Sequence, residues 1–465
     1  EPGSHHARAL GAMRKRLSAG SWRVYDERPG DGNRNYARSW RAREAAFMFQ
    51  LTREGAYADA AYEALRAIYE QPDPDGRLAD EGYGLSRAMV GVGLALAYDW
   101  AYSGWTEAER RWVRARIEEA LDAWPDYRHA NIETEHLASN WVAVCRGGEL
   151  LMMLAIGAEE ERAERFRFLK NALRTHLENG YGPIGWSQEG IGYASYAGQF
   201  LLPAVFALES VGDSALRAAM PKHPFYRLPM AAGALVPDRL TLTSGVDDGT
   251  AVGDQGWASL LLRAVPDAHR GAYRYFYDRF MGICHPRPPS EKFDPERAGT
   301  VWALLFYPGS SRGSSRGFGS SHGLDSTAST HRAGRRSAGP GRCETPRIER
   351  SALPRRLFDR ERGVYYFRFG WRPEWRSGRG VLVSLTGDYA HHGHAWDAAE
   401  AFQLNVLTGG TRFAGGPGKA GAGSDPDPSA FSTLLVDGRI VEDGARTGRP
   451  VFASANEEGG GYVIV

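Results

Sequence analysis

The chain has 465 residues, of which 42% are hydrophobic, and its formal net charge is +1. This length allows two or three domains with their own cores, and the balanced charge excludes the strong positive field of a nucleic-acid-binding or membrane-surface protein. The most apolar stretches, Leu150–Ile156 and Phe200–Leu208, are far shorter than the roughly 18 apolar residues of a membrane span. Three widely separated cysteines, Cys145, Cys284 and Cys343, form no CxxC pair and exclude a disulfide framework. We therefore expect a soluble globular protein without a nucleic-acid partner and without membrane insertion.

From about residue 35 to residue 306, apolar residues recur at three- and four-residue spacing, which predicts helices. The expected helices are Tyr57–Gln71, Ser86–Ser103, Thr106–Trp124, Ser139–Ile156, Glu159–Asn179 and Gly190–Val211. Thr106 and Ser139 are suited to cap the N-termini of their helices. The short breaks between helices predict stacked antiparallel hairpins, and the absence of a fixed sequence repeat argues against a regular solenoid.

Between Gly309 and Pro354 the chain is rich in Ser, Gly, Arg, His and Thr and almost without apolar residues. Such a segment cannot order itself by burying apolar surface, so it is either a linker or a locally misread sequence. After Phe358 the apolar pattern changes to a period of two, which predicts strands. The expected strands are Gly363–Trp371, Gly380–Gly387, Glu400–Gly409, Phe431–Gly438, Pro450–Ala453 and Gly461–Val465.

The order of helices first and strands second predicts an α+β multidomain fold. We expect a helical domain at residues 1–308, the low-complexity segment at 309–356 and an antiparallel β-sheet domain at 357–465. Glu1 is not an initiator Met and no apolar leader follows it, which favours either a removed signal peptide or a fragment. The alternation that predicts the last strand is still running at Val465, so we expect further C-terminal sequence.

The first motif combines Asn140 and Trp141, at the start of an expected helix, with the pair Gly147-Gly148 inside it. Each Gly within a helix costs roughly 1 kcal/mol relative to Ala. The pair therefore indicates either the close packing of a neighbouring helix or a gap that faces a ligand. In the same way, Asn140 is either a helix cap or a ligand-binding amide.

The second motif places Glu189, Tyr193 and Tyr196 at four- and three-residue spacing, so that on a helix they share one face. A carboxylate and two phenols suit the lining of a polar cleft. The alternative is that both tyrosines pack with their hydroxyl groups outward.

The third motif is the segment Tyr389–Asp397, which holds three histidines and an aspartate between two expected strands. In an extended conformation His392 and His394 point the same way, which suits a metal or proton-transfer site. The alternative is a set of solvated loop histidines. The tryptophans beside the three motifs are either sugar-stacking platforms or core residues: Trp141, Trp186 and Trp396.

Taken in order, these motifs resemble those of the heparinase II/III-like and alginate-lyase superfamily of polysaccharide lyases. The matching residues are Asn140-Trp141 with Gly147-Gly148, Glu189-Gly190 with Tyr193, His392-Gly393-His394, and Phe431–Gly438. The resemblance covers most of the chain. It implies an incomplete (α/α) toroid followed by an antiparallel, sandwich-like β-sheet domain, with the substrate cleft between them. It also implies an exported protein, periplasmic or extracellular.

The activity that the resemblance implies is β-elimination at a uronic acid of an acidic polysaccharide, the expected partner of this chain. Tyr193 then corresponds to the catalytic acid or base, His392 to its partner base or charge neutraliser, and Asn140 to the amide that neutralises the uronate carboxylate. A tyrosine can take this role if a nearby cation lowers its pKa from about 10. The candidate substrate-binding residues are His136, Trp141, Arg146, Trp186, Glu189, Tyr196 and Trp396.

Some members of this superfamily bind zinc, and His394 matches one of the ligands. The second ligand corresponds to the region of Gly415–Gly416 and the third to Phe431, neither of which can bind a metal. Even with Asp397 as a substitute, one matching ligand does not make a zinc site. We therefore expect no certain cofactor.

Two other classes of function stay open. A glycoside hydrolase on a similar helical scaffold would use Glu189 with Asp247 or Asp248 as acid and base, although the two aspartates suit a polar turn better. A non-catalytic carbohydrate-binding or scaffold protein would bind saccharides without turnover. Ser139, where related enzymes often have His, and Phe431 favour this second alternative.

Overall fold

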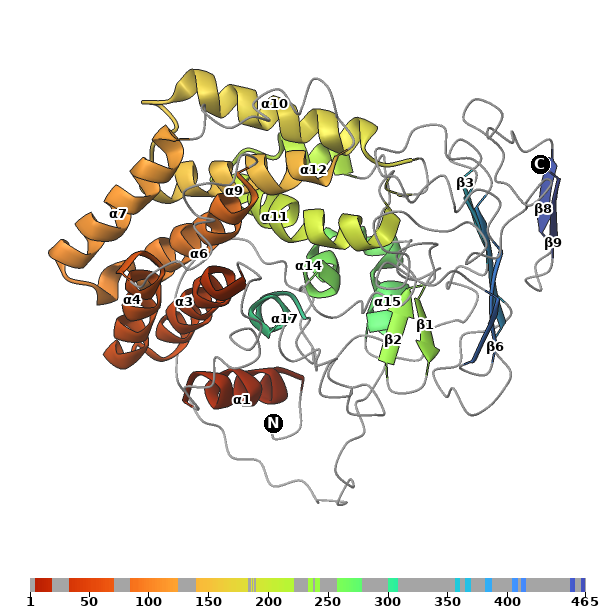
Figure 1. Ribbon diagram of the computed structural model, residues 1–465, viewed down its shortest axis with the longest axis horizontal. Coiled ribbons are helices and arrows are strands. Elements are labelled where there is room, and N and C mark those ends of the chain that lie inside the picture. Colours follow the sequence, from red (N-terminus) through yellow and green to blue (C-terminus); the bar gives the residue numbers. More distant parts are fainter. Residues whose placement is uncertain are drawn as a thin grey trace, which may run out of the picture.

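The computed structural model places helices in the N-terminal part of the chain and short strands in the C-terminal part (Figure 1). The residues that it describes are 5–18, 33–70, 84–123, 139–182, 185, 187, 190–220, 233–236, 239–242, 257–277, 300–307, 356–359, 364–368, 381–386, 404–408, 411–414, 452–455 and 461–464. The first helices are α1 (His5–Ser18), α3 (Asn33–Thr52), α4 (Gly55–Glu70), α6 (Leu85–Ala101), α7 (Glu107–Asp122) and α9 (Asn140–Ile156). They are followed by α10 (Ala163–Asn179), α11 (Gly190–Ser210), α12 (Ala215–Ala219), α14 (Trp257–Ala264), α15 (Asp267–Phe276) and α17 (Thr300–Phe306), and the 3-10 turn η1 (Tyr102–Gly104) follows α6.

The helices expected between residues 57 and 211 are confirmed, and their ends differ by a few residues at most. Two of the expected caps are also confirmed. Thr106 forms a capping box with Glu109, and the Ser139 side chain accepts a hydrogen bond from the backbone N–H of Trp141. Ser139, and not Asn140, is therefore the N-cap of α9. Helix α1 was not expected, because helices were predicted only from about residue 35.

Contacts between side chains show whether neighbouring helices run parallel or antiparallel to each other. On α9 and α10, Glu149 pairs with Arg165 and Val142 packs against Ala172, so these two helices are antiparallel. On α3 and α6, the Ser39 hydroxyl donates to the carbonyl of Met89, and the Gln50 amide donates to that of Trp100, so these two helices are parallel. Helices α6 and α9 are also parallel, since Ala88 lies next to Gly148 and Gly91, further along α6, lies next to Met152, further along α9.

Seven of the described helices, each in contact with the next, form a closed circuit, which we call the ring. Helix α3 packs against α6, α6 against α9, α9 against α11, α11 against α14, α14 against α17, α17 against α1, and α1 against α3. Helices α4, α7, α10, α12 and α15 pack on the ring as its covering helices, and α10 lies along α9 (Figure 1). Where α1 closes the circuit, Arg16 pairs with Glu44 at 2.7 Å and the His5 ring stacks on Tyr307 at 3.7 Å.

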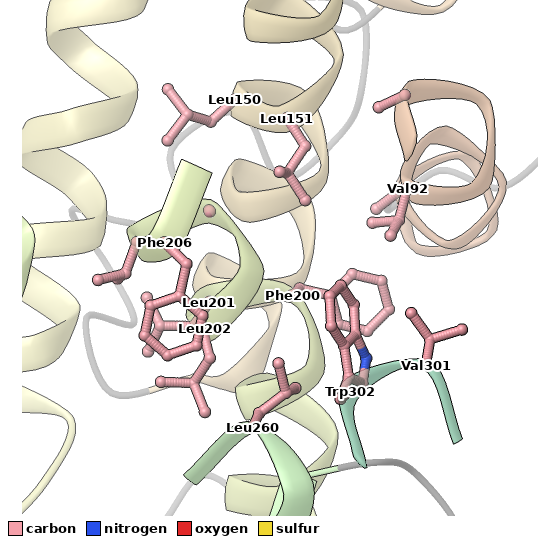
Figure 2. Packing of buried hydrophobic residues seen from close by; sticks show 14 of the residues in the cluster. Val92, Leu150, Leu151, Phe200, Leu201, Leu202, Phe206, Leu260, Val301 and Trp302 are labelled. Carbon is pink, nitrogen blue, oxygen red and sulfur yellow. The ribbon is translucent and has the colours of Figure 1, made fainter. Parts of the chain in front are cut away.

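The pair Gly147-Gly148 lies where ring helices cross. A Cβ atom on Gly147 would lie 2.8 Å from the carbonyl oxygen of Phe200 in α11, and one on Gly148 would lie 3.0 Å from Ala88 in α6. Of the two interpretations of this pair, close packing is therefore the one that the structure supports. Around the crossing, residues of α6, α9, α11, α14 and α17 form one buried hydrophobic cluster (Figure 2).

Gly147→Ala is expected to lower the free energy of unfolding by about 1–3 kcal/mol, because the added methyl group meets backbone atoms of α11 that cannot rotate away. The matched control is Gly11→Ala in α1, where a Cβ meets nothing within 4 Å and is expected to stabilise by about 0.5–1 kcal/mol. Urea unfolding measures both changes. Equal effects of the two substitutions would contradict the close crossing at Gly147.

The strands in the described part of the chain form three antiparallel groups. Strands β1 (Gly233–Val236) and β2 (Arg239–Leu242) pair within the helical part, and β8 (Phe452–Ala455) pairs with β9 (Gly461–Ile464). A five-stranded sheet has the order β3 (Arg356–Asp359), β4 (Val364–Arg368), β5 (Val381–Thr386), β6 (Leu404–Thr408) and β7 (Thr411–Ala414). The expected strand Phe431–Gly438 and nearly all of the segment 309–356 lie outside the described residues. Among the helices that are described, none is long and apolar enough to cross a membrane.

Candidate functional site

The connections between helices differ in length at the two ends of the ring. Those that lead from a ring helix to its covering helix are short: 53–54, 102–106, 157–162, 211–214 and 265–266. Those that lead from a covering helix into the next ring helix are longer: 71–84, 123–139, 180–189, 220–256 and 277–299. Long connections on one side of a rigid scaffold commonly carry binding and catalytic residues. The candidate position of a site is therefore the end where the ring helices begin, which we call the N-terminal face.

Asn140 and Tyr193 both belong to this face. Tyr181 and Ser187 form an antiparallel bridge between α10 and α11, which reverses the chain so that α11 runs in the same direction as α9. The two helices cross where Gly147 meets Phe200. Asn140 precedes Gly147, and Tyr193 precedes Phe200, by seven residues, which is about two helical turns or 10 Å along the axis. Each side chain therefore leaves its helix on the same side as the residue at the crossing. The amide and the phenol thus lie on the facing sides of α9 and α11, at the same end of the ring.

The two residues differ in exposure. Asn140 is the first residue of α9, directly after its cap, and is 2% exposed. Tyr193 lies in the first turn of α11 and is half-buried. The Asn140 amide is thus recessed and the Tyr193 phenol is more accessible. A recessed amide suits a hydrogen-bond donor to a bound carboxylate, and an accessible phenol suits proton transfer to a substrate.

Tyr196 and Trp141 make packing contacts. Tyr196 is half-buried, and its ring meets that of Phe200 edge to face at 5.5 Å. Trp141 packs against a small cluster of Val142 and Ala172, between α9 and α10. Both observations agree with the packing interpretation of these two aromatic residues.

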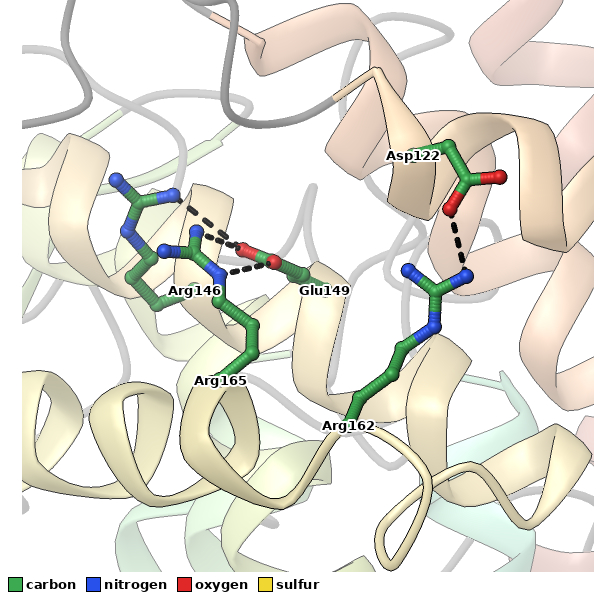
Figure 3. A network of polar contacts seen from close by, with 5 residues as sticks. All are labelled: Asp122, Arg146, Glu149, Arg162 and Arg165. Carbon is green, nitrogen blue, oxygen red and sulfur yellow. Dashed lines mark hydrogen bonds and ion pairs between the residues drawn. The ribbon is translucent and has the colours of Figure 1, made fainter.

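Arg146 lies in a buried ion-pair network between α9 and α10 (Figure 3). Its side chain is 2% exposed and donates to Glu149 at 3.3 Å, while Arg165 donates to both oxygens of the same carboxylate at 2.7 and 2.8 Å. The Arg146 guanidinium also lies over the Phe168 ring of α10. These contacts point away from the α11 side of α9, so we leave Arg146 out of the proposed site.

The remaining candidate residues lie outside the described part of the chain. They are His136, Trp186, Glu189, Asp247, Asp248, His392, His394, Trp396 and Asp397. The convergence of His392 with Tyr193 therefore stays a prediction. Within the described ranges, no group of three His, Cys, Asp or Glu side chains could hold a metal ion.

Sequence reasoning missed a set of residues whose contacts cross the interior of the ring. The Tyr36 hydroxyl donates to Oε1 of Gln199 at 3.0 Å, and the Tyr36 ring lies 4.7 Å from that of Trp40. The Arg43 guanidinium lies 5.0 Å from Trp40 and 5.5 Å from Trp302, which in turn meets Trp100. Tyr36, Trp40, Arg43 and Phe47 recur at four- and three-residue spacing, a signal that could have shown this face of α3.

The comparisons with known proteins add no relative. The chain matches no protein-family model and no curated protein sequence. The sequence motifs and the geometry described above are therefore what indicates a function for this chain.

Proposed function

We propose that this protein is a lyase that cleaves a uronic-acid-containing polysaccharide by β-elimination. The observation that carries the proposal is the position of Asn140 and Tyr193, two turns before the Gly147–Phe200 crossing and on facing sides of two parallel helices. The resemblance of the motifs supplies the roles of these residues and adds His392. As the substrate is a polymer, we also propose that the protein acts outside the cytoplasm.

The proposed reaction needs residues of these types. A base removes the proton at C5 of the uronate, the electron pair forms the C4=C5 double bond, and the C4–O glycosidic bond breaks. An acid then protonates the departing oxygen. Negative charge builds up on the carboxylate as the C5 proton leaves, so a preorganised amide donor at that position lowers the barrier. Asn140 would be this donor, Tyr193 would be the acid or base, and His392 would be its partner.

The direction of the ring helices supports an acidic substrate. Arg263 of α14 pairs with Glu209 of α11 and lies over the ring of Phe306 in α17, which brings the C-terminal ends of these three helices together. The N-termini of α3, α6, α9, α11, α14 and α17 therefore lie at the opposite end, the N-terminal face. Each helix N-terminus carries about half a positive elementary charge. The N-terminal face thus combines several positive dipole ends, which favours an anionic ligand there.

The side-chain contacts that cross the interior of the ring also bear on the proposal. Below Tyr36 and Gln199, the side chains of Trp40, Arg43 and Trp302 occupy the space between α3 and α17. We therefore propose that a polymer binds across the N-terminal face and not through the ring.

For the fold, we propose an (α/α) toroid with a β-sheet domain as its partner. The closed circuit of contacts and the alternation of ring and covering helices support the toroid. The resemblance implies an incomplete toroid, whereas α1 joins α17 to α3 here, so we propose a ring that α1 closes. The sheet β3–β7 supports the second domain.

The test is an absorbance screen of the full chain against acidic polysaccharides of the heparan, chondroitin, alginate and ulvan types. The expected result is ultraviolet absorbance from the conjugated C4=C5 double bond, formed from at least one polymer. New reducing ends without this absorbance would indicate a glycoside hydrolase. Saccharide binding without any cleavage would indicate a non-catalytic protein. Either of these outcomes would refute the lyase.

A further inference from the structure

The Tyr36–Gln199 hydrogen bond joins two helices that are not neighbours in the ring. Between α3 and α11 stand α6 and α9 on one side, and α14, α17 and α1 on the other. The bond from the Tyr36 hydroxyl to Oε1 of Gln199, 3.0 Å long, therefore crosses the interior. The hydrogen bond from Ser39 to Met89, in contrast, joins the neighbouring helices α3 and α6.

The position of this bond is close to the proposed site. Tyr36 lies in the first turn of α3, so the bond lies just inside the N-terminal face. Gln199 lies in α11 less than two turns after Tyr193, and its amide nitrogen is within 3.4 Å of the carbonyl oxygens of Ser195 and Tyr196. Gln199 is 7% exposed, so both ends of its amide are held in a nearly water-free environment.

A second side of α11, about 100° around the helix from Gln199, is held at the same level. Phe200, next to Gln199 in the sequence, makes the close contact with Gly147 of α9. Helix α11 is thus fixed at one level by an apolar contact with α9 and by a hydrogen bond to α3. The two turns that carry Tyr193 extend from this level toward the N-terminal face.

We propose that Tyr36 and Gln199 are a positioning pair, which holds α11 across the ring and so sets the place of Tyr193 relative to Asn140. Neither side chain is a catalytic residue in this proposal. The effect on catalysis rests on the proposed lyase function, whereas the effect on α11 does not.

The test uses Tyr36→Phe and Gln199→Met, which remove the bond and keep most of the side-chain volume. The matched control is Ser39→Ala, which removes a hydrogen bond one turn further along α3 that joins neighbouring helices. Hydrogen–deuterium exchange of the first turns of α11, residues 190–196, is expected to rise about fivefold in the first two variants and to stay within about twofold in the control. Unchanged exchange in Tyr36→Phe, or an equal rise in Ser39→Ala, would overturn the positioning pair.

Kinetics with the polymer found in the absorbance screen give the second measurement. Tyr36→Phe is expected to lower kcat about tenfold and to change KM less than threefold, because a displaced phenol affects the chemical step more than ground-state binding. A purely structural role would instead lower the melting temperature and leave kcat unchanged, which would refute the proposal. If the wild-type chain forms no unsaturated product, the lyase assignment fails, and the exchange measurement decides the positioning pair alone.

Discussion

Tyr193→Phe is expected to reduce turnover by about 10²–10⁴-fold, the contribution that a general acid or base makes to a proton transfer. The substitution removes only the hydroxyl group of a half-buried side chain in the first turn of α11, so the free energy of unfolding should change by less than about 1 kcal/mol. The rate of formation of the unsaturated product measures the first effect, and urea unfolding measures the second.

The matched control is Tyr196→Phe. This tyrosine lies three residues further along the same helix, and its ring packs edge to face against Phe200 at 5.5 Å. Removal of its hydroxyl group is expected to change turnover by less than about threefold, because its ring contact is retained. Full activity in Tyr193→Phe would remove that residue from the mechanism. A large loss in Tyr196→Phe alone would assign the phenol to Tyr196 instead.

Glu149→Gln is expected to lower the free energy of unfolding by about 3–5 kcal/mol. Glu149 is 1% exposed and accepts hydrogen bonds from Arg146 and Arg165 (Figure 3). Without the carboxylate, Arg165 can turn toward solvent, since its side chain is 31% exposed. Arg146, at 2% exposure, would stay buried without the negative charge of Glu149. Urea or thermal unfolding measures the loss.

The control for Glu149→Gln is Asp122→Asn, which removes the other ion pair of Figure 3. Asp122 is bound by Arg162 at 2.6 Å, but its side chain is 66% exposed. Exposed pairs of this kind contribute about 0–1 kcal/mol, so little change is expected. If both variants lost the same stability, the burial of the Arg146–Glu149 pair would not be the cause.

The predicted helices were close to the observed ones because the signals that define them are local. The capping box at Thr106 and the cap at Ser139 act over three residues or fewer, and the apolar spacing within α9 and α11 acts over one or two turns. Helix α1 was missed although Ala9, Met13 and Leu17 recur at four-residue spacing. Its burial depends on contacts with α17 and α3, which are remote in sequence.

The candidate site was predicted in part. The types and order of the motif residues indicated Asn140 and Tyr193, and the crossing at Gly147 accounts for their common end of the ring. Arg146 was expected to bind substrate as a candidate helper of Asn140 at the uronate carboxylate, a role that the resemblance implies. Its partner Glu149 is only one turn away, but the burial that makes this pair structural comes from α10. Tyr36 and Gln199 could not be paired from the sequence, because nothing local connects two residues on α3 and α11.

The amino-acid sequence by itself determined where the helices begin and end, since capping and apolar periodicity depend on residues within a few positions of each other. Only the tertiary structure decided which helices meet, which glycines serve close packing and which charges are neutralised internally. The physical reason is that these outcomes depend on burial, and a side chain is buried only when segments far apart in the chain pack against it.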